Sequence, residues 1–202
     1  MRWDRLFEDL EGQLASEWEA ERAALDSEAE RLRLSRLPLQ ERLRALAATE
    51  GDASAAFDLV DGTVLTARVT AVGADWAGID SLGGQGGSGL LPLPAIAAIG
   101  LSMAEVLRSA RPDAPSAHRR LAERMTLGFV LRDLARRRIP MTLHLIGGRA
   151  YSGTIDRALH DHLDIALHDP GTPRRASEVT GVRVVPLTSI AWARLDSAVG
   201  VA

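Results

Sequence analysis

Histidine and aspartate alternate in one short segment of this chain of 202 residues, from His160 to Asp164. His168 follows the segment, and His144 lies on a predicted neighbouring strand. Imidazole and carboxylate groups can together hold a divalent metal ion, and a histidine can respond to pH near neutrality. Alternate residues of a strand share one face. The residue types and their spacing therefore raise the hypothesis of a metal site or a pH-sensitive site.

A structural role is the interpretation that we favour for this segment. His160 and Asp161 are expected in a turn, and a turn breaks the shared face. Beyond the turn, Leu163, Ile165 and Leu167 alternate as the apolar inner face of a strand, so the polar residues between them would face solvent. We therefore predict no metal site and no cofactor.

Other catalytic chemistry finds little support in the residue types. The chain has no Cys, which excludes thiol catalysis and zinc–thiolate sites. Residues 83–89 are rich in glycine but lack the Lys and the following helix of a phosphate-binding loop, so they are expected to form a flexible hairpin loop. Ser152 and the histidines do not have the spacing of a nucleophile with its base. We expect a non-enzymatic protein with no small-molecule substrate.

Arginine supplies all 24 basic residues, because the sequence contains no Lys. It contains no Asn either, and since both missing residues have A-rich codons, the arginine content indicates a GC-rich genome. Residues 1–50 carry 8 Arg and 12 acidic residues, residues 51–116 carry 3 and 7, and residues 117–202 carry 13 and 8. The basic part can bind a polyanion, or it can complement the acidic part within the protein or between subunits. We favour the second interpretation.

If the basic part binds nucleic acid, ten arginines are candidates for phosphate contacts. They are Arg119, Arg120, Arg124, Arg136, Arg137, Arg138, Arg149, Arg157, Arg174 and Arg175. The three consecutive residues Arg136, Arg137 and Arg138 also suit the carboxyl-terminal end of a helix, where positive charge interacts favourably with the helix dipole. We favour that structural role for these three residues. Aromatic residues make up 4% of the chain, which disfavours single-strand binding by base stacking.

The composition of residues 1–37 predicts one long helix, since it contains no Pro and only one Gly. Apolar residues recur at every third or fourth position, as they do on one face of a helix. These residues are Trp3, Phe7, Leu10, Leu14 and Trp18. A helix of about 50 Å can bury such a stripe against a partner helix or against its own domain. The five residues are therefore candidates for self-association, with an intramolecular brace as the alternative.

Two further helices are predicted, over residues 39–48 and 116–138. The first follows the stop signal of Pro38, and Ser116 is a plausible N-cap of the second. The centre of the second helix, residues 125–134, is apolar on nearly every side, so we expect it to lie between layers. Residues 39–43 also match residues 121–125, which suggests that the two helices are related.

An internal repeat organises the strand-rich parts of the chain. Residues 57–79 align without a gap with residues 143–165, at an offset of 86, and residues 92–96 match residues 186–190 at an offset of 94. Each copy contains a short strand, a tight turn that ends in Gly62 or Gly148, a long strand and three more short strands. We expect the five strands of each copy to close, or nearly close, into a small barrel.

The second copy carries a resemblance to a known family. The stretch 148–155, followed by 161–167, resembles the first signature of Sm-like proteins, and the resemblance extends over residues 119–195 and, more loosely, 39–100. It implies a helix followed by a five-stranded SH3-like barrel, and assembly into rings that bind RNA. Where the family has an Asn that contacts a base, this chain has Asp164 and, in the first copy, Gly78. A carboxylate at this position repels phosphate.

The whole chain also resembles bacterial proteins of high-GC genomes, some of which are labelled Fis-type transcriptional regulators. Residues 1–7 and 129–134 carry this resemblance. A regulator of that type would need a helix-turn-helix whose second helix enters the major groove. The carboxyl-terminal residues are typical of strands instead, so we give the label little weight.

The predicted fold class is α+β, with a long N-terminal helix (1–37), a first Sm-like module (38–101), a linker (102–116), a second module (117–196) and a tail (197–202). No apolar run reaches the length of about 18 residues that a membrane span needs, so we expect a cytoplasmic protein that does not contact a membrane. We predict a non-enzymatic scaffold that forms homo-oligomers or binds a protein partner. The alternative is a regulatory protein that binds RNA or DNA through the basic second module.

Overall fold

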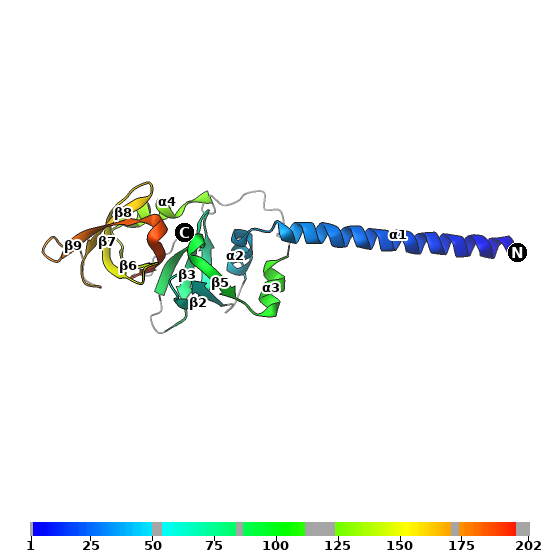
Figure 1. The fold of residues 1–202 in the computed structure, drawn as a ribbon, viewed down its shortest axis with the longest axis horizontal. Helices are drawn as coiled ribbons and strands as arrows, with labels where there is room; N and C mark the ends of the chain where they lie inside the picture. Colours follow the sequence, from blue (N-terminus) through cyan, green and yellow to red (C-terminus); the bar gives the residue numbers. More distant parts are fainter. Residues whose placement is uncertain (1, 50–53, 84–86, 112–123, 171–173, 197–202) are drawn as a thin grey trace. The chain divides into compact units, whose positions relative to one another are not determined.

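The computed structural model describes residues 2–49, 54–83, 87–111, 124–170 and 174–196, with side chains from Glu11 onward. It contains a long N-terminal helix and a large antiparallel sheet, and thus belongs to the α+β class (Figure 1). By its contacts the chain divides into two compact units, Met1–Pro38 and Leu39–Ala202. Among the described residues, no helix is both long enough and apolar enough to cross a membrane.

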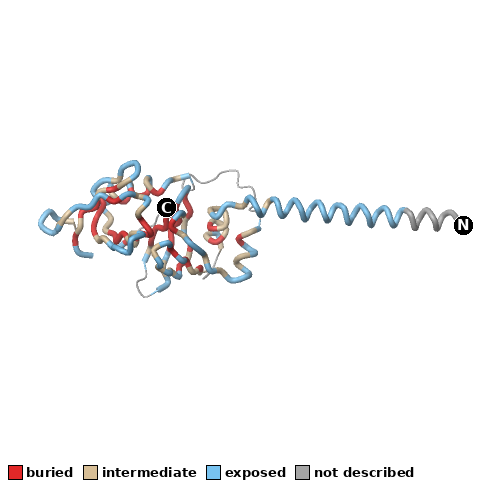
Figure 2. Tube along the Cα trace, viewed as in Figure 1, coloured by how far each residue is buried: buried red, intermediate tan, exposed pale blue. Residues whose placement is uncertain are grey.

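The first unit is the single helix α1 (Arg2–Ser35), which confirms the predicted long helix. Its 34 residues span about 50 Å at the usual rise per residue. Nearly all of its described residues are exposed, whereas the buried residues gather in the second unit (Figure 2). Over residues 11–35, where the side chains are described, no core therefore holds the helix together, and local contacts along its surface contribute instead.

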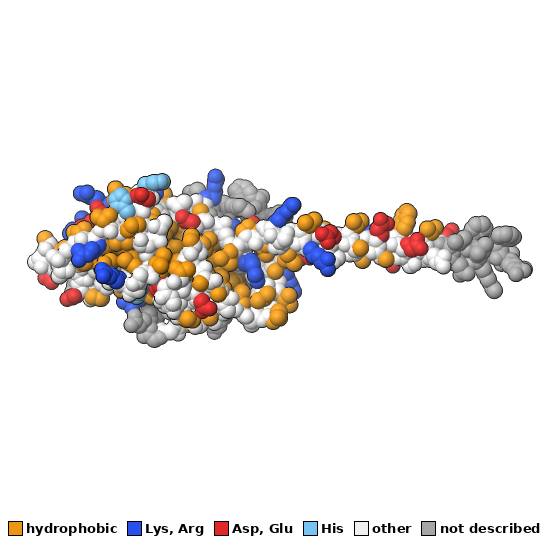
Figure 3. Space-filling model, in the orientation of Figure 1, with side chains coloured by type: hydrophobic (Ala, Val, Ile, Leu, Met, Phe, Trp, Pro, Cys, Tyr) orange, Lys and Arg blue, Asp and Glu red, His pale blue; other side chains and the backbone are white. Residues whose placement is uncertain are grey.

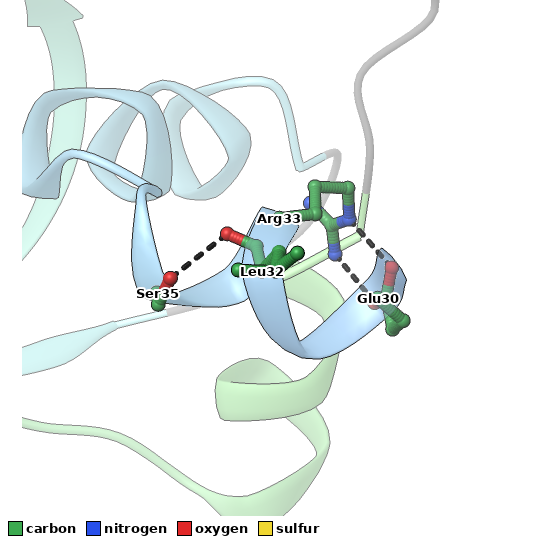
Figure 4. Close-up of polar contacts among 4 residues, drawn as sticks. All are labelled: Glu30, Leu32, Arg33 and Ser35. Atoms are coloured by element: carbon green, nitrogen blue, oxygen red, sulfur yellow. Dashed lines mark hydrogen bonds and ion pairs between the residues drawn. The ribbon is translucent and has the colours of Figure 1, made fainter. Parts of the chain in front are cut away.

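Those local contacts are clear near the end of α1. The Arg33 guanidinium donates hydrogen bonds to both carboxylate oxygens of Glu30, each at 2.7 Å, and the Ser35 hydroxyl donates to the Leu32 carbonyl at 2.9 Å (Figure 4). The ion pair joins residues three positions apart, a spacing that brings side chains together on a helix. The pair also lowers the pKa of Glu30 below its ordinary value, because Arg33 donates to the charged carboxylate.

The second unit is built on ten antiparallel strands. They are β1 (Ala55–Leu59), β2 (Val64–Val72), β3 (Trp76–Ser81), β4 (Gly87–Pro92), β5 (Ile96–Gly100), β6 (Pro140–Leu145), β7 (Ala150–Ala158), β8 (His162–Leu167), β9 (Gly181–Pro186) and β10 (Ile190–Leu195). The strands form one sheet in the order β5-β1-β2-β3-β4-β10-β6-β7-β8-β9. The sheet is not closed, and β5 and β9 are its two edges.

The strand registers of the two copies correspond. Phe57 lies opposite Leu65 in the first copy, as Leu143 lies opposite Tyr151 in the second. The second and third strands of each copy share the same register shift, which follows Val69 in one copy and Ile155 in the other. The two turn glycines, Gly62 and Gly148, both have positive φ angles, of 86° and 76°. The two copies therefore fold through the same turns and pairings.

The two copies pair with each other directly, whereas the sequence predicted two barrel modules joined by a linker. Strand β4 of the first copy pairs with β10 of the second, with Leu90 opposite Ala193 and Gly89 opposite Arg194. Because this pair joins the halves, the strands form one continuous sheet. The order within each half is the same, since β5-β1-β2-β3-β4 corresponds to β10-β6-β7-β8-β9.

Helices α2 (Leu39–Ala47) and α4 (Leu127–Arg136) precede the two groups of strands, and each packs on the long strand of its own copy. Leu43 and Leu46 of α2 correspond to Leu131 and Leu134 of α4, and all four are buried. The buried leucines therefore align the two helices at an offset of 88, whereas the predicted match of residues 39–43 with 121–125 has an offset of 82 and includes residues 121–123, which lie outside the described residues. Residues 116–123, the predicted start of the second helix, lie outside the described residues.

One side of α4 faces solvent, contrary to the prediction that its apolar centre lies between layers. Leu127, Val130, Leu131 and Leu134 are buried, whereas Phe129 is exposed. The buried residues recur at three- and four-residue spacing and face a single layer, the sheet.

A third helix, α3 (Met103–Ser109), lies within the predicted linker. Ser102 accepts a hydrogen bond from the Glu105 backbone N–H, and the Glu105 carboxylate accepts one from the Ser102 N–H at 2.8 Å. This capping box could have been found in the sequence, since Ser followed three residues later by Glu marks a helix start. The helix packs on α2, where the Arg42 guanidinium donates to the Ser109 hydroxyl at 3.0 Å.

Gly153 of β7 provides a test of the close approach of β7 and β8. A Cβ atom at Gly153 would lie 2.0 Å from the carbonyl oxygen of Ala166 on β8, so only glycine lets the two strands approach this closely. We expect Gly153→Ala to lower the free energy of unfolding by about 3 kcal/mol, because backbone rather than a flexible side chain must move. Urea denaturation measures this change.

The matched control is Gly147→Ala in the neighbouring turn, where a Cβ atom would meet nothing within 4 Å. We expect this variant to change the free energy of unfolding by less than about 1 kcal/mol. Equal effects of the two substitutions would contradict the close approach of β7 and β8.

Candidate interaction surfaces

The segment of alternating histidine and aspartate forms no metal cluster. His162 Nδ1 lies 2.7 Å from Asp161 Oδ1, and this hydrogen bond lowers the pKa of the Asp161 carboxyl below its ordinary value. Over the described ranges, no three His, Cys, Asp or Glu residues are arranged to hold a metal ion. The contact between His162 and Asp161 is thus a local one at the start of β8.

His168 does not share the solvated face that alternation suggested. It is buried, and its Nε2 lies 2.8 Å from the Thr154 hydroxyl of β7. A second contact joins its Nδ1 to the Asp169 carbonyl at 3.2 Å. These contacts give the histidine a structural role between β7 and the end of β8, which strand periodicity alone could not indicate.

Three of the arginines predicted to contact phosphate are held by carboxylates. Arg136 and Arg137 both pair with Asp133 one helical turn earlier, and Arg174 pairs with Asp156 at 2.6 Å. Arg119 and Arg120 lie outside the described residues. The remaining candidates are exposed: Arg124, Arg138, Arg149, Arg157 and Arg175. Of the eight described candidates, three are therefore already paired with carboxylates and five are exposed.

A smaller basic cluster surrounds Tyr151 on β7. Hydrogen bonding from Arg149, and to a lesser extent from Arg183, lowers the pKa of the Tyr151 hydroxyl below its ordinary value. The Arg183 guanidinium also lies 6.0 Å from the centre of the tyrosine ring. Arg183 was absent from the sequence-based candidates, because its strand approaches Tyr151 only through the fold of the sheet. Two guanidinium groups beside an aromatic ring form a surface to which an anion can bind.

The predicted self-association stripe lies on α1. Trp3, Phe7 and Leu10 belong to the helix, but their side chains are outside the described part. Leu14 and Trp18 are 55% and 64% exposed. Apolar side chains continue at intervals along the described part of the helix, among acidic and basic ones (Figure 3). Large exposed apolar side chains that follow one helix face are typical of an interaction surface.

The junction between the two copies combines a strand pair with side-chain contacts and shared core residues. Beside the β4–β10 pair, the turn before β3 contacts the start of α4. The Leu127 N–H donates to Asp75 Oδ1 at 2.6 Å, and the Trp76 indole donates to the Met125 carbonyl at 3.0 Å. A carboxylate at a helix N-terminus accepts from unpaired N–H groups and interacts favourably with the helix dipole. Asp75 of the first copy therefore caps the helix of the second.

Core residues also cross the junction. Trp76 and Leu90 of the first copy belong to the apolar cluster of the second, together with Leu127 and Leu131 of α4. In the other direction, Trp192 of β10 belongs to the cluster of the first copy. Each half therefore completes the core of the other.

An aromatic pair lies on the same junction. The rings of His144 and Trp192 stack with centroids 3.9 Å apart and planes within 5°. Burial lowers the pKa of His144, and the nearby charge of Arg194 lowers it further. The low pKa favours the neutral imidazole, which stacks on the indole without burying a charge.

The two edges of the sheet repeat the junction strands without a partner. Val184 of β9 occupies the position that Leu90 has in β4, yet Val184 is 66% exposed and Leu90 only 1%. Ala97 and Ala98 of β5 are exposed, whereas their counterparts in β10 are buried. The strand edges that are covered at the junction of β4 and β10 are thus open in their counterparts, β9 and β5, at the two ends of the sheet.

Comparisons of the chain with protein-family models, with curated proteins and with solved structures found no match. The fold and these surfaces define an α+β protein with a long N-terminal helix and an open, internally repeated antiparallel sheet.

Asp75 allows the junction to be tested. We expect Asp75→Ala to lower the free energy of unfolding by about 1 kcal/mol, because the Leu127 N–H loses its acceptor and α4 loses its cap. Asp75→Asn keeps an acceptor oxygen and should retain most of the stability. Chemical denaturation of the three proteins measures the difference. Equal losses in both variants, or none in either, would contradict a capping role.

Proposed function

We propose that this protein is a non-enzymatic scaffold that associates with further copies of itself. The observation that supports this most directly is the exposure of Val184 on an open sheet edge, where its counterpart Leu90 is buried against the other copy. An edge strand offers unpaired N–H and C=O groups to another strand. Exposed apolar side chains on that edge add a surface that favours burial.

We further propose that each half of the sheet, with its preceding helix, is an Sm-like module. Supporting this, each half places its fifth strand beside its first, in the order β5-β1-β2-β3-β4 and again in β10-β6-β7-β8-β9. A short 3₁₀ turn after a proline joins the last two strands of each half, at Leu93–Ala95 and Leu187–Ser189. The long second strand carries a register shift in both halves, which is the usual device for bending a strand.

Helix α1 provides a second surface for self-association. Trp18, Leu25 and Leu32 recur at seven-residue intervals and are exposed. Seven-residue spacing keeps apolar side chains on the seam between two packed helices. A second copy of α1 is the occupant that we propose for this seam.

The mass of the protein in solution tests the proposal. We expect light scattering to give a mass above that of one chain, 21.7 kDa. In the Val184→Lys variant we expect this mass to fall, because a charge on the edge opposes strand addition. The matched control is Val64→Lys, since Val64 is similarly exposed but lies on an interior strand. Circular dichroism checks that both variants are folded. A wild-type monomer at all concentrations would contradict self-association.

The cluster around Tyr151 supports a second candidate function, the binding of RNA or DNA. Arg149 and Arg183 flank an aromatic ring there, and such a group can contact a phosphate and stack on a base. This function would use only part of the basic second module, because Arg136, Arg137 and Arg174 already pair with carboxylates.

A salt series tests this second function. With a labelled single-stranded RNA oligonucleotide, we expect Arg149→Gln to weaken binding and to reduce the slope of log affinity against log salt by about 1. Arg174→Gln serves as the control and should leave the slope unchanged, because Arg174 already pairs with Asp156. Binding that does not depend on salt would contradict phosphate contacts.

A further inference from the structure

We propose that the stack of His144 on Trp192 is a pH-sensitive switch, in which protonation of the imidazole releases the indole from the core of the first copy. This inference goes beyond the proposed self-association, because it concerns how the junction of the two copies responds to acid. His144 of β6 lies directly opposite Trp192 of β10. The indole packs in the apolar cluster of the first copy, so the ring pair joins a histidine of one half to the core of the other.

The stack holds one nitrogen of each ring away from both water and hydrogen-bond partners. His144 Nε2 and Trp192 Nε1 are both buried, and neither forms a hydrogen bond with a described residue. The ring centroids lie 3.9 Å apart and the planes are nearly parallel, so the imidazole has the face of the indole beside it. A positive charge that is buried without an acceptor costs free energy. The stack therefore suits the neutral imidazole.

Two charged groups act on His144 in opposite directions. Arg194 of β10 brings a positive charge near the imidazole, whereas Asp61, in the turn between β1 and β2, brings a negative one. On the other side of β6, the residue of β7 opposite His144 is the uncharged Ala150. Burial has the largest effect and acts together with Arg194, so the pKa of His144 lies below its ordinary value despite Asp61.

A cavity beside Trp192 gives the indole room to leave the stack. Its volume is about 330 Å³, and Trp192 and Arg194 of β10 form part of its wall. Leu65 of β2, Ile79 of β3 and Gly89 of β4 also line it. Close packing ordinarily holds a core side chain in one position. The indole has open space beside it instead, and the charge of the imidazole determines whether the stacked position is favoured.

The lowered pKa determines the direction of the pH effect. In the unfolded chain His144 takes up a proton near its ordinary pKa of 6.5, whereas in the folded protein it does so only at a lower pH. The stack therefore contributes its full stability above about pH 6.5. As the pH falls below this value the contribution is lost, because the unfolded chain binds a proton that the folded protein does not. Below the lowered pKa, the folded protein is protonated as well and the indole is released.

An NMR titration of the full chain, with sequence-specific assignment of both rings, tests the switch directly. We expect the ring signals of His144 to titrate below pH 6.5, and the indole N–H signal of Trp192 to shift with the same midpoint. Arg194→Gln should raise this midpoint because it removes a like charge, and Asp61→Asn should lower it because it removes an opposite one. The control is His160→Gln, which changes an exposed histidine and should leave the midpoint unchanged.

The pH dependence of thermal unfolding provides a second measurement. Between about pH 7.5 and pH 5, the Tm of the wild type and of His160→Gln should fall further than that of His144→Gln, in which residue 144 cannot titrate. Equal falls in all three proteins would overturn the proposal.

The wild-type titration decides the proposal even if a variant does not fold, because both midpoints come from one protein. A His144 midpoint at or above pH 6.5 would overturn it, since the indole would then stabilise the imidazolium by a cation–π interaction. A Trp192 signal that does not follow the titration of His144 would overturn the release of the indole.

Discussion

The backbone pairing of β4 with β10 is the interaction on which the rest of the second unit depends. It turns two five-stranded groups into one sheet, and it brings the turn before β3 against the start of α4. Neither core is complete without it, because Trp76 and Leu90 lie in the cluster of the second copy and Trp192 lies in that of the first. Strand pairing, helix capping and core packing thus stabilise the same boundary together.

The repeat explains why the ends of the sheet differ in chemistry from the junction. Where the junction has Trp76 and Leu90, the free end has His162 and Val184, which are smaller, and the first of them is polar. Arg183 stands at the free edge where the junction has Gly89. A charged residue on an edge strand opposes nonspecific addition of other strands. The free edge thus keeps the general shape of the buried one while remaining compatible with solvent.

The strands and turns could be predicted from the sequence, because apolar–polar alternation and the turn sequences Asp61–Gly62 and Gly147–Gly148 determine them locally. The sequence predicts a tight turn that ends in Gly62 in the first copy and in Gly148 in the second, and both glycines have positive φ angles in the structure. The union of the copies could not be predicted in this way, since alternation indicates which face of a strand is buried and not which edge is paired. Similar limits apply to single residues. His168 and Arg183 owe their contacts to strands that come together only through the fold.

The basic cluster around Tyr151 links the two proposed functions through one residue. Arg183 lies on the edge strand, and side chains alternate along a strand, so its guanidinium points to the opposite face from Val184. Pairing of β9 would therefore occupy the backbone of Arg183 and leave its side chain beside Tyr151. An assembled chain would therefore present the cluster once for each copy.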